Sequence, residues 1–401
     1  FMGDIGDPIT DADPGTPGDQ PAVIGLSAFT SIGGALNAAT PSGTVVVNDG
    51  DYSTENISLS DMVTLQLANT AGPVQIGNLG SGQTNSVVLQ GNNTLEVGAL
   101  NLSAPGVNCA ISGSGNITKV GTGTFVVRQI NSYTGTTTVL DGRFRVGFDN
   151  ALDLQSELAG DGPVVVTAPG RFELNVDVDK TINQTGAISG TGSVGTLGDG
   201  TAVFDGPGPN TFSGGFELGD GGLSSFDGVD QGAKNGFVVV NHSGHLGTGG
   251  ILSRGSQVQA GSPGVVIPND IEVDGGGFRN GGTIPFGYSG TIGPINNALR
   301  GYGNYGLAGC DITVSGAISM TTAAHQVQFE GSNDRDNGSW NISGDITGVS
   351  NLIVQNTFDG GVVTIAGTND YTGTTTIQTG TTAIFDGTHT GGGVYTVQNG
   401  G

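Results

Sequence analysis

The sequence has few charged residues, and positive charge is the scarcest. Charged residues make up 11% of the 401 residues, with 11 Lys and Arg against 35 Asp and Glu and a net charge of −24. A typical soluble domain has roughly 25% charged residues. Because no basic stripe exists to neutralise phosphates, we expect no nucleic-acid partner and no docking on an anionic lipid surface.

Cysteine and long apolar runs are also scarce. Two cysteines, Cys109 and Cys310, do not make a disulfide scaffold. No apolar run approaches the ~20 residues that cross a bilayer, so we expect no membrane span. No signal peptide is visible and residue 1 is Phe, which we interpret as a mature or trimmed product.

Glycine and the strand-forming residues dominate what remains. The chain contains 77 Gly, and 35% of its residues are hydrophobic, with many Val, Ile and Thr. A disordered chain would combine high charge with few β-branched residues, so we favour an ordered all-β protein over a Gly-rich disordered one. Short apolar runs, for example at 45–47, 87–89 and 164–166, are bounded by Gly, Asn, Asp or Ser. Strands this short are typical of a β-solenoid rather than a sandwich.

The composition divides the chain into three regions. Residues 1–21 form an extended acidic arm rich in Pro, Gly and Asp. Asp11 and Asp13 in this arm are candidate Ca²⁺ ligands, although their spacing fits no EF-hand loop and a solvated arm is favoured. Residues 22–43 form a capping segment with one short helix, which Ser31 can N-cap. Residues 44–401 form the β-solenoid.

A short phrase recurs through the solenoid region at intervals of about 80 residues, or about four coils of roughly 20 residues each. The phrase is an aromatic residue, Ser or Thr, then Gly, and Asn precedes the aromatic by two in three copies. The aromatic and glycine pairs are Tyr133 and Gly135, Phe212 and Gly214, Tyr288 and Gly290, and Tyr371 and Gly373. A second phrase, beginning Ile-Ser-Gly, lies upstream of three copies at 111–115, 188–192 and 342–348. We expect these residues to be structural.

The solenoid bears on the two cysteines. About 200 residues separate them, which is about ten coils or on the order of 45 Å at the ~4.8 Å strand spacing. A disulfide needs Cα atoms within about 7 Å, so the fold excludes pairing within the chain. We expect buried free thiols at Cys109 and Cys310, the alternative being a bridge between stacked subunits.

Residues 111–147, which read ISGSGNITKVGTGTFVVRQINSYTGTTTVLDGRFRVG, resemble the autotransporter-associated β-strand repeat. Residues 342–387 resemble it as well, and residues 188–228 do so more loosely. Residues 28–66 are similar to the start of a pectate-lyase-like right-handed parallel β-helix, in which an amphipathic helix caps the first coil. The resemblance implies an exported bacterial β-helix that is extracellular or displayed at the cell surface.

Enzymes on β-helices need particular residue sets. Polysaccharide lyases of that kind place Ca²⁺-binding carboxylates beside a basic residue, and hydrolases use paired carboxylates. The best local candidate is Arg335 between Asp334 and Asp336, with Glu330 nearby, in a polar stretch that favours a solvated loop. A histidine pair, His242 and His245, lacks a third metal ligand nearby. We therefore expect no catalytic residue, no metal and no cofactor.

Three functional hypotheses remain. The first is a non-catalytic extracellular scaffold or adhesin that binds a cell-surface glycan or protein. The second is a subunit of a filament or surface layer that forms a homopolymer through the solenoid ends or the N-terminal arm. The alternative to both is a polysaccharide-acting lyase or hydrolase on the same fold.

Overall fold

The structure is a computed structural model, and it divides into two compact units. The first contains residues 1–146 with 159–162, and the second contains residues 147–158 with 163–401. The residues that the structure describes are 8–9, 22–23, 29–39, 41–60, 62–68, 72–82, 84–102, 106–147, 162–219, 236–254, 257–273, 284–295, 299–302, 311–321, 326–331, 339–356, 362–391 and 393–398.

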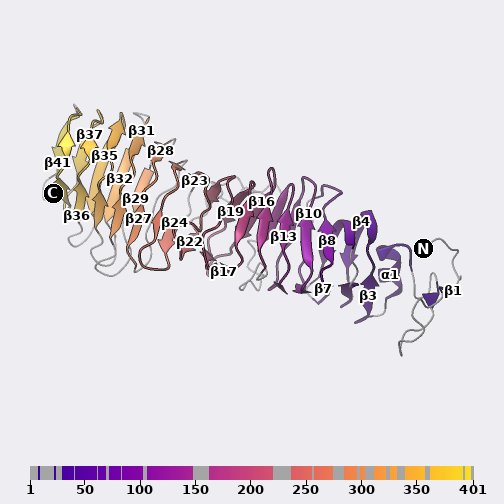
Figure 1. Cartoon of the computed structure of the whole chain (residues 1–401). Coiled ribbons are helices and arrows are strands. Elements are labelled where there is room, and N and C mark those ends of the chain that lie inside the picture. The colour runs from indigo at the N-terminus through magenta and orange to yellow at the C-terminus, as the bar shows by residue number, and fades with distance from the viewer. Residues whose placement is uncertain are drawn as a thin grey trace. The chain divides into compact units, whose positions relative to one another are not determined.

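One short helix, α1 (Ile32–Ala38), precedes the coils of the first unit (Figure 1). Ser31 is its N-cap, and the Ser31 hydroxyl accepts a hydrogen bond from the Gly34 amide at 3.0 Å. The Glu55 carboxylate accepts two more, from the amides of Ile32 at 3.2 Å and Gly33 at 2.9 Å. Three amides at the helix start are thus satisfied, one by the cap and two by a strand of the solenoid. No described helix has the length and apolar character to cross a membrane.

The strands of the first unit stack into parallel ladders, coil upon coil. Val45, Leu65, Val87 and Ile111 lie in register and are buried, so successive coils contain 20, 22 and 24 residues. The strands are β3 (Thr44–Val47), β4 (Gly50–Leu59), β5 (Thr64–Leu67), β6 (Pro73–Ser81), β7 (Ser86–Leu89), β8 (Thr94–Val97), β9 (Ala110–Gly113), β10 (Asn116–Lys119), β11 (Thr124–Val127), β12 (Ser132–Tyr133), β13 (Thr137–Val139) and β14 (Arg143–Val146). In the arm, β1 (Pro8–Ile9) pairs antiparallel with β2 (Ala22–Val23), which lies at the start of the capping segment.

The second unit repeats this architecture with less regular coils. Its strands are β15 (Val164–Val166), β16 (Arg171–Asn175), β17 (Thr181–Gln184), β18 (Ile188–Gly190), β19 (Ser193–Leu197), β20 (Thr201–Phe204), β21 (Phe216–Leu218), β22 (Phe237–Val240), β23 (Ile251–Ser253), β24 (Gln257–Ala260), β25 (Val266–Ile267), β26 (Ile271–Val273), β27 (Phe286–Tyr288), β28 (Ile292–Ile295), β29 (Leu299–Tyr302), β30 (Ile312–Val314), β31 (Ile318–Met320), β32 (Gln326–Gly331), β33 (Trp340–Ile342), β34 (Ile346–Gly348), β35 (Asn351–Asn356), β36 (Val362–Ile365), β37 (Thr368–Asn369), β38 (Thr375–Ile377), β39 (Thr382–Phe385), β40 (Thr388–His389) and β41 (Tyr395–Val397).

Coil length varies in the second unit. Phe237 lies in register with Thr201, 36 residues earlier, and Trp340 with Ile312, 28 residues earlier. The expectation of a uniform coil of about 20 residues is therefore wrong here. The strand ladder constrains only the residues that pair, so extra residues are accommodated between strands.

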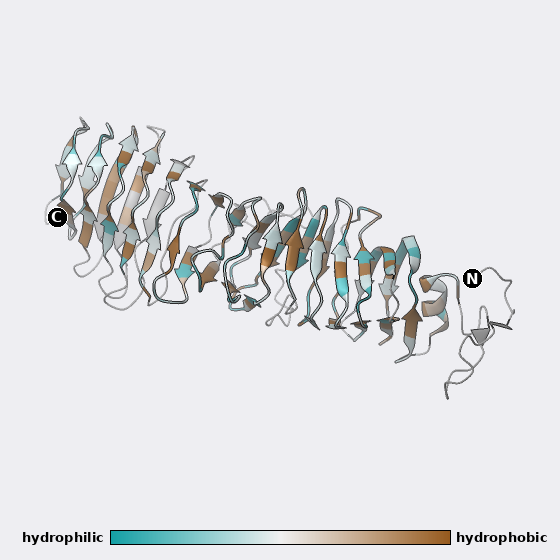
Figure 2. Cartoon of the chain, viewed as in Figure 1, coloured by the Kyte–Doolittle hydropathy of each residue, from teal (hydrophilic) through white to brown (hydrophobic). Residues whose placement is uncertain are grey.

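Burial alternates along the strands of both units. In β22 and in β36, for example, every second residue is buried. Hydrophobic residues recur on the strands from coil to coil in Figure 2. The core of each unit is thus a set of stacked Val, Ile, Leu and Phe side chains. The prediction of an all-β parallel solenoid with one short helix is confirmed.

Candidate functional site

The aromatic residues of the recurring phrase are buried. Tyr133, Phe212, Tyr288 and Tyr371 are each at most 4% exposed. In two of them the tyrosine hydroxyl forms a hydrogen bond with a threonine hydroxyl: Tyr133 with Thr137 and Tyr371 with Thr375, each at 2.6 Å. Burial raises the pKa of Tyr133 to about 12, against the opposing effect of the Thr137 hydrogen bond. Such a phenol is neutral at ordinary pH and serves packing.

The asparagine two residues before the aromatic joins one coil to the coil before it. Asn131 accepts from the Ile111 amide at 3.0 Å, Asn210 from the Ile188 amide at 2.8 Å, and Asn369 from the Ile346 amide at 3.0 Å. Each side-chain amide also donates to a backbone carbonyl, on Gln129, His245 and Gly367 respectively. We call Asn131, Asn210 and Asn369 the clamp asparagines.

The clamp explains why the two phrases occur together. The clamp asparagine accepts a hydrogen bond from the amide of the isoleucine that begins the upstream phrase, one coil earlier. This isoleucine is Ile111 in the first copy and Ile188 in the second. In the third copy the partner is Ile346, so Ile346-Thr347-Gly348 is the equivalent phrase and not Ile342-Ser343-Gly344.

The glycine of the recurring phrase lies against the backbone of the preceding coil. A Cβ atom on Gly135 would lie 2.1 Å from the Gly115 oxygen, and one on Gly373 would lie 1.9 Å from the Ser350 oxygen. Gly214 and Gly290 are equally confined, with backbone atoms at 2.4 Å and 2.0 Å. Any side chain there would push the coils apart. The recurring glycines, like the clamp asparagines, therefore contact the neighbouring coil directly.

The remaining sequence candidates have varied outcomes. Cys109 is buried, and burial raises the pKa of its thiol, so the described cysteine has the surroundings of a core residue. Cys310, Asp11, Asp13, Asp334, Arg335 and Asp336 lie outside the described residues, as does the side chain of Glu330.

His245 is buried and uses both ring nitrogens. Its Nδ1 atom lies 3.3 Å from the Asn241 amide, and its Nε2 atom lies 3.1 Å from the Gly206 carbonyl oxygen. This pattern places the proton on Nε2 and leaves the neutral ring as an acceptor at Nδ1. Burial lowers the pKa of His245, in keeping with a neutral ring. His242 Nδ1 accepts from the Gly244 amide at 3.0 Å. Among the described residues no group of three metal-ligating side chains is formed.

Lys119 in β10 is an ionisable group that the sequence did not single out. It is 1% exposed, and its ammonium donates to the carbonyls of Val120 and Gly121 at 2.6 Å and of Asp141 at 3.3 Å. The last of these belongs to the next coil. Burial lowers the pKa of Lys119 to about 8, with the Asp141 charge opposing it.

The buried lysine makes stability depend on pH. Between about pH 8 and the ordinary value of 10.5, the unfolded chain holds a proton that the folded chain has released. The free energy of unfolding should therefore rise with pH across this window, by up to about 3 kcal/mol. Comparing wild type with Lys119→Met by urea denaturation, at about pH 7 and about pH 9.5, cancels the other titrating groups. We expect the free energy of unfolding of wild type, relative to that of Lys119→Met, to increase as pH rises. A constant difference would contradict this expectation.

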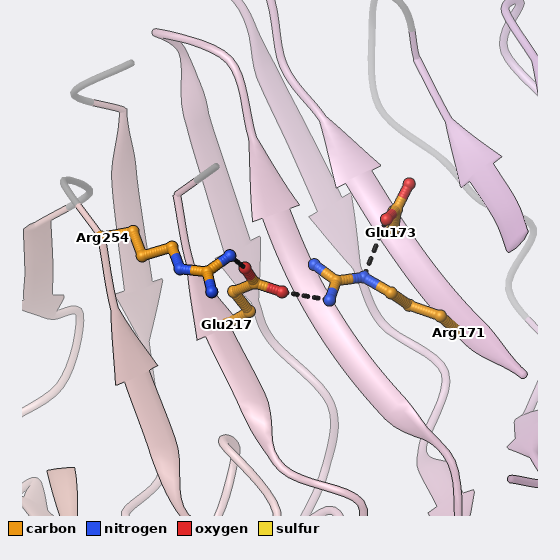
Figure 3. A network of polar contacts seen from close by, with 4 residues as sticks. All are labelled: Arg171, Glu173, Glu217 and Arg254. Atoms are coloured by element: carbon orange, nitrogen blue, oxygen red, sulfur yellow. Dashed lines mark hydrogen bonds and ion pairs between the residues drawn. The ribbon is translucent and has the colours of Figure 1, made fainter. Parts of the chain in front are cut away.

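A four-residue ion network lies on the part of the ten-stranded sheet that the second unit contributes (Figure 3). The Glu217 carboxylate on β21 lies between Arg171 of β16 and Arg254, and each arginine bonds one of its oxygens. Arg171 also pairs with Glu173 through Nε at 2.7 Å. Burial disfavours the charged guanidinium of Arg171, but the attraction of Glu173 and Glu217 outweighs it and raises the pKa.

Glycine at position 195 permits the contact across coils. Glu173, Gly195 and Glu217 lie in register on successive strands β16, β19 and β21. A Cβ on Gly195 would lie 2.4 Å from Arg171 Nη2, so the guanidinium occupies the space that a side chain would take. Arg171 can therefore reach Glu217 two coils away.

Removing the central carboxylate should destabilise the second unit. Glu217→Ala leaves two partly buried guanidinium groups without their shared partner, at an expected cost of about 2 kcal/mol. Glu217→Gln keeps the shape and one acceptor oxygen, so we expect about half that loss. Fluorescence of Trp340, the single tryptophan and a buried residue of this unit, reports the denaturation. Equal stability of Glu217→Ala and wild type would show that the network contributes nothing.

A groove of about 600 Å³ adjoins this network. Its lining includes Arg171, Glu217, Asp270 and Glu272, with several glycines. None of these charged residues was among the candidates from the sequence. In the sequence, the only sign of this alignment is the equal spacing of Glu173, Gly195 and Glu217. The alignment continues through Leu252 to Glu272, but the longer coil before Leu252 interrupts the equal spacing.

The fold defines a parallel β-solenoid built on a repeated coil-joining phrase. Two segments, residues 117–146 and 356–384, match the family model described as the passenger-associated-transport-repeat. They lie within the predicted repeat segments 111–147 and 342–387. Neither a curated protein nor a solved structure matches the chain. The two repeats and the solenoid fit an autotransporter-passenger-like β-helix protein, and the repeat implies a secreted or cell-surface bacterial protein.

Proposed function

We propose that the protein is a non-catalytic extracellular β-solenoid that acts as a scaffold or adhesin, presenting the outer faces of its coils to a partner. The observation that carries the proposal is the role of the repeated residues. The clamp asparagines and the confined glycines join one coil to the next, and the aromatics are buried in the core. The repeated residues thus allow one coil to stack on another, and each added coil contributes outer surface, which is what a scaffold requires.

The chemistry of the groove supports a non-catalytic role. Glycoside hydrolysis needs a carboxyl group that transfers a proton and a second carboxylate beside it. Glu217, at the centre of the ion network, has each carboxylate oxygen bound to an arginine, so both oxygens already serve as acceptors in ion pairs.

Incubating the full chain with polysaccharides tests this proposal. We expect no new reducing ends and no unsaturated products from polygalacturonate, cellulose or starch. Product that disappears in Glu217→Gln or in Arg335→Ala would support the lyase or hydrolase alternative and overturn the proposal. The two variants separate the groove from the sequence candidate around Arg335.

A second candidate, self-assembly, rests on the last described strand. β41 is at the end of its sheet and pairs with β38. Val394, Tyr395 and Val397 are 65%, 48% and 60% exposed. A strand edge that carries apolar side chains is a template for a further strand, and we propose a second copy of this chain as its source.

Electron microscopy of the purified chain tests self-assembly. Ordered fibres that disappear in Val397→Lys would support stacking at this edge, whereas separate particles would contradict it. Deleting residues 1–21 tests the arm, because fibres of unchanged stability would exclude assembly through a donated arm segment.

A further inference from the structure

The groove on the second unit lies over the outward face of a continuous sheet. Strands β16, β19, β21, β23 and β26 pair in parallel, and each inner strand is bonded on both sides. Gly215 and Gly250 immediately precede β21 and β23 and lie on successive coils. The groove exists because two neighbouring coils have no side chain at this position.

The groove is bounded by charged and hydroxyl-bearing side chains. Arg171 and Ser193 lie on the coils before the two glycines, and Asp270 and Glu272 lie on the coil after them. Glu217 forms part of its side. The ion pairs of Arg171 use Nε and Nη1, so the Nη2 donors are left for a ligand. Carboxylate oxygens bound by arginine keep further lone pairs that can accept from hydroxyl groups.

We propose that this groove binds a neutral linear glycan, which deepens the proposed function by naming the partner class and rests on it. The groove crosses successive coils, whose ~4.8 Å spacing is close to the advance per sugar of an extended glycan chain. A peptide would need a free strand edge for its backbone, and these strands offer none. Sugar hydroxyls both donate and accept, matching the mixed donors and acceptors of the lining.

The charge of the lining selects against polyanions. Asp270 and Glu272 are contributed by one coil, and the chain as a whole carries −24. A uronate chain would place its carboxylates beside these groups, and the juxtaposition of like charges opposes binding. Neutral glycans are therefore expected to bind in preference to acidic ones.

Gly250 offers a variant that fills the groove without straining the coil. A Cβ there would meet only the Asp270 oxygen, at an ordinary 3.6 Å. Gly250→Leu should therefore fold and occupy the ligand's place. Gly208→Leu is the matched control, because a Cβ on Gly208 meets nothing within 4 Å and Gly208 does not line the groove. Ser193→Leu narrows the groove from another coil, and it replaces Gly250→Leu as the groove-filling variant if Gly250→Leu fails to fold.

The experiment is titration calorimetry of the full chain with cellohexaose, maltohexaose, laminarihexaose and hexagalacturonate. We expect at least one neutral hexasaccharide to bind, with affinity reduced about tenfold or more by Gly250→Leu or Ser193→Leu and unchanged by Gly208→Leu. Hexagalacturonate should bind more weakly. The assignment is overturned if no neutral hexasaccharide binds, if the groove-filling variants bind like wild type, or if hexagalacturonate binds best.

The same samples separate this inference from the proposed function. If the hexasaccharides are neither bound nor cleaved, the proposal that the groove binds a glycan is wrong, whereas the proposal of a non-catalytic scaffold still stands. Cleavage of a bound hexasaccharide supports the groove and overturns the non-catalytic role.

Discussion

Replacing Gly373 with alanine should lower the free energy of unfolding of the second unit by about 3 kcal/mol or more. The added Cβ would lie 1.9 Å from the Ser350 oxygen, and atoms in contact need more than 3.0 Å. Both atoms are rigidly held by the backbone, so the coils must separate. That movement would stretch neighbouring bonds such as that from the Leu352 amide to the Thr374 oxygen, now 2.9 Å.

Gly208→Ala is the matched control for this prediction. Gly208 belongs to the same unit and has nothing within 4 Å of its added Cβ. We expect a change within about 0.5 kcal/mol for this variant. Guanidinium denaturation followed by Trp340 fluorescence measures both. If the two alanine variants have equal stability, close stacking of coils at the recurring glycine is wrong.

Replacing Asn131 with alanine should destabilise the first unit by about 3 kcal/mol. The side chain is fully buried, and its loss leaves the Ile111 amide and the Gln129 carbonyl without these bonds. Each buried group that loses its partner costs about 1–3 kcal/mol, because no water replaces the bond. Far-ultraviolet circular dichroism during denaturation gives the loss.

Two variants show whether the cost comes from the clamp. Asn131→Asp keeps the acceptor for Ile111 but sets a buried carboxylate against the Gln129 carbonyl, so it should cost at least as much as alanine at neutral pH and less once acid protonates the carboxyl group. Asn351→Ala removes a similar coil-to-coil bond, to the Thr374 amide at 2.9 Å, from an exposed site. Water can replace that bond, and we expect a loss of at most about 1 kcal/mol. Equal losses for Asn131→Ala and Asn351→Ala would contradict the argument.

The fold could be predicted from the sequence because the architecture of a solenoid depends on patterns between residues that are close together in the chain. Alternating burial, short strands and glycine at the coil contacts are all local properties. The Ser31 cap and the parallel ladders were accessible for this reason. The Glu55 contact with α1 was not, because it joins residues more than twenty positions apart.

Register was harder to predict than architecture. The third upstream phrase was placed at 342–348, and the clamp from Asn369 identifies Ile346 as its start. The sequence there contains two similar phrases, Ile-Ser-Gly and Ile-Thr-Gly, and only the hydrogen bond distinguishes them. Asn85, which bonds the Val63 amide at 2.9 Å, makes a comparable clamp without any aromatic phrase to mark it.

The groove and the buried lysine could not be found from the sequence. Coil lengths in the second unit vary, so Glu217 and Glu272 align only when the strand register is known. Lys119 occurs in a strand where alternation alone predicts an inward residue, yet a single lysine gives no sign of three carbonyl partners. These features arise from stacking, which sequence spacing does not fix when coils differ in length.

Hydrogen exchange at single-residue resolution tests most directly whether the repeated phrase is a device for joining coils. In the wild-type chain the amides of Ile111, Ile188 and Ile346 should all be protected, because each donates to a buried clamp asparagine. In Asn131→Ala, exchange at Ile111 should accelerate about a hundredfold while Ile188 and Ile346 stay protected. Unchanged exchange at Ile111 would contradict the structural role assigned to the repeat.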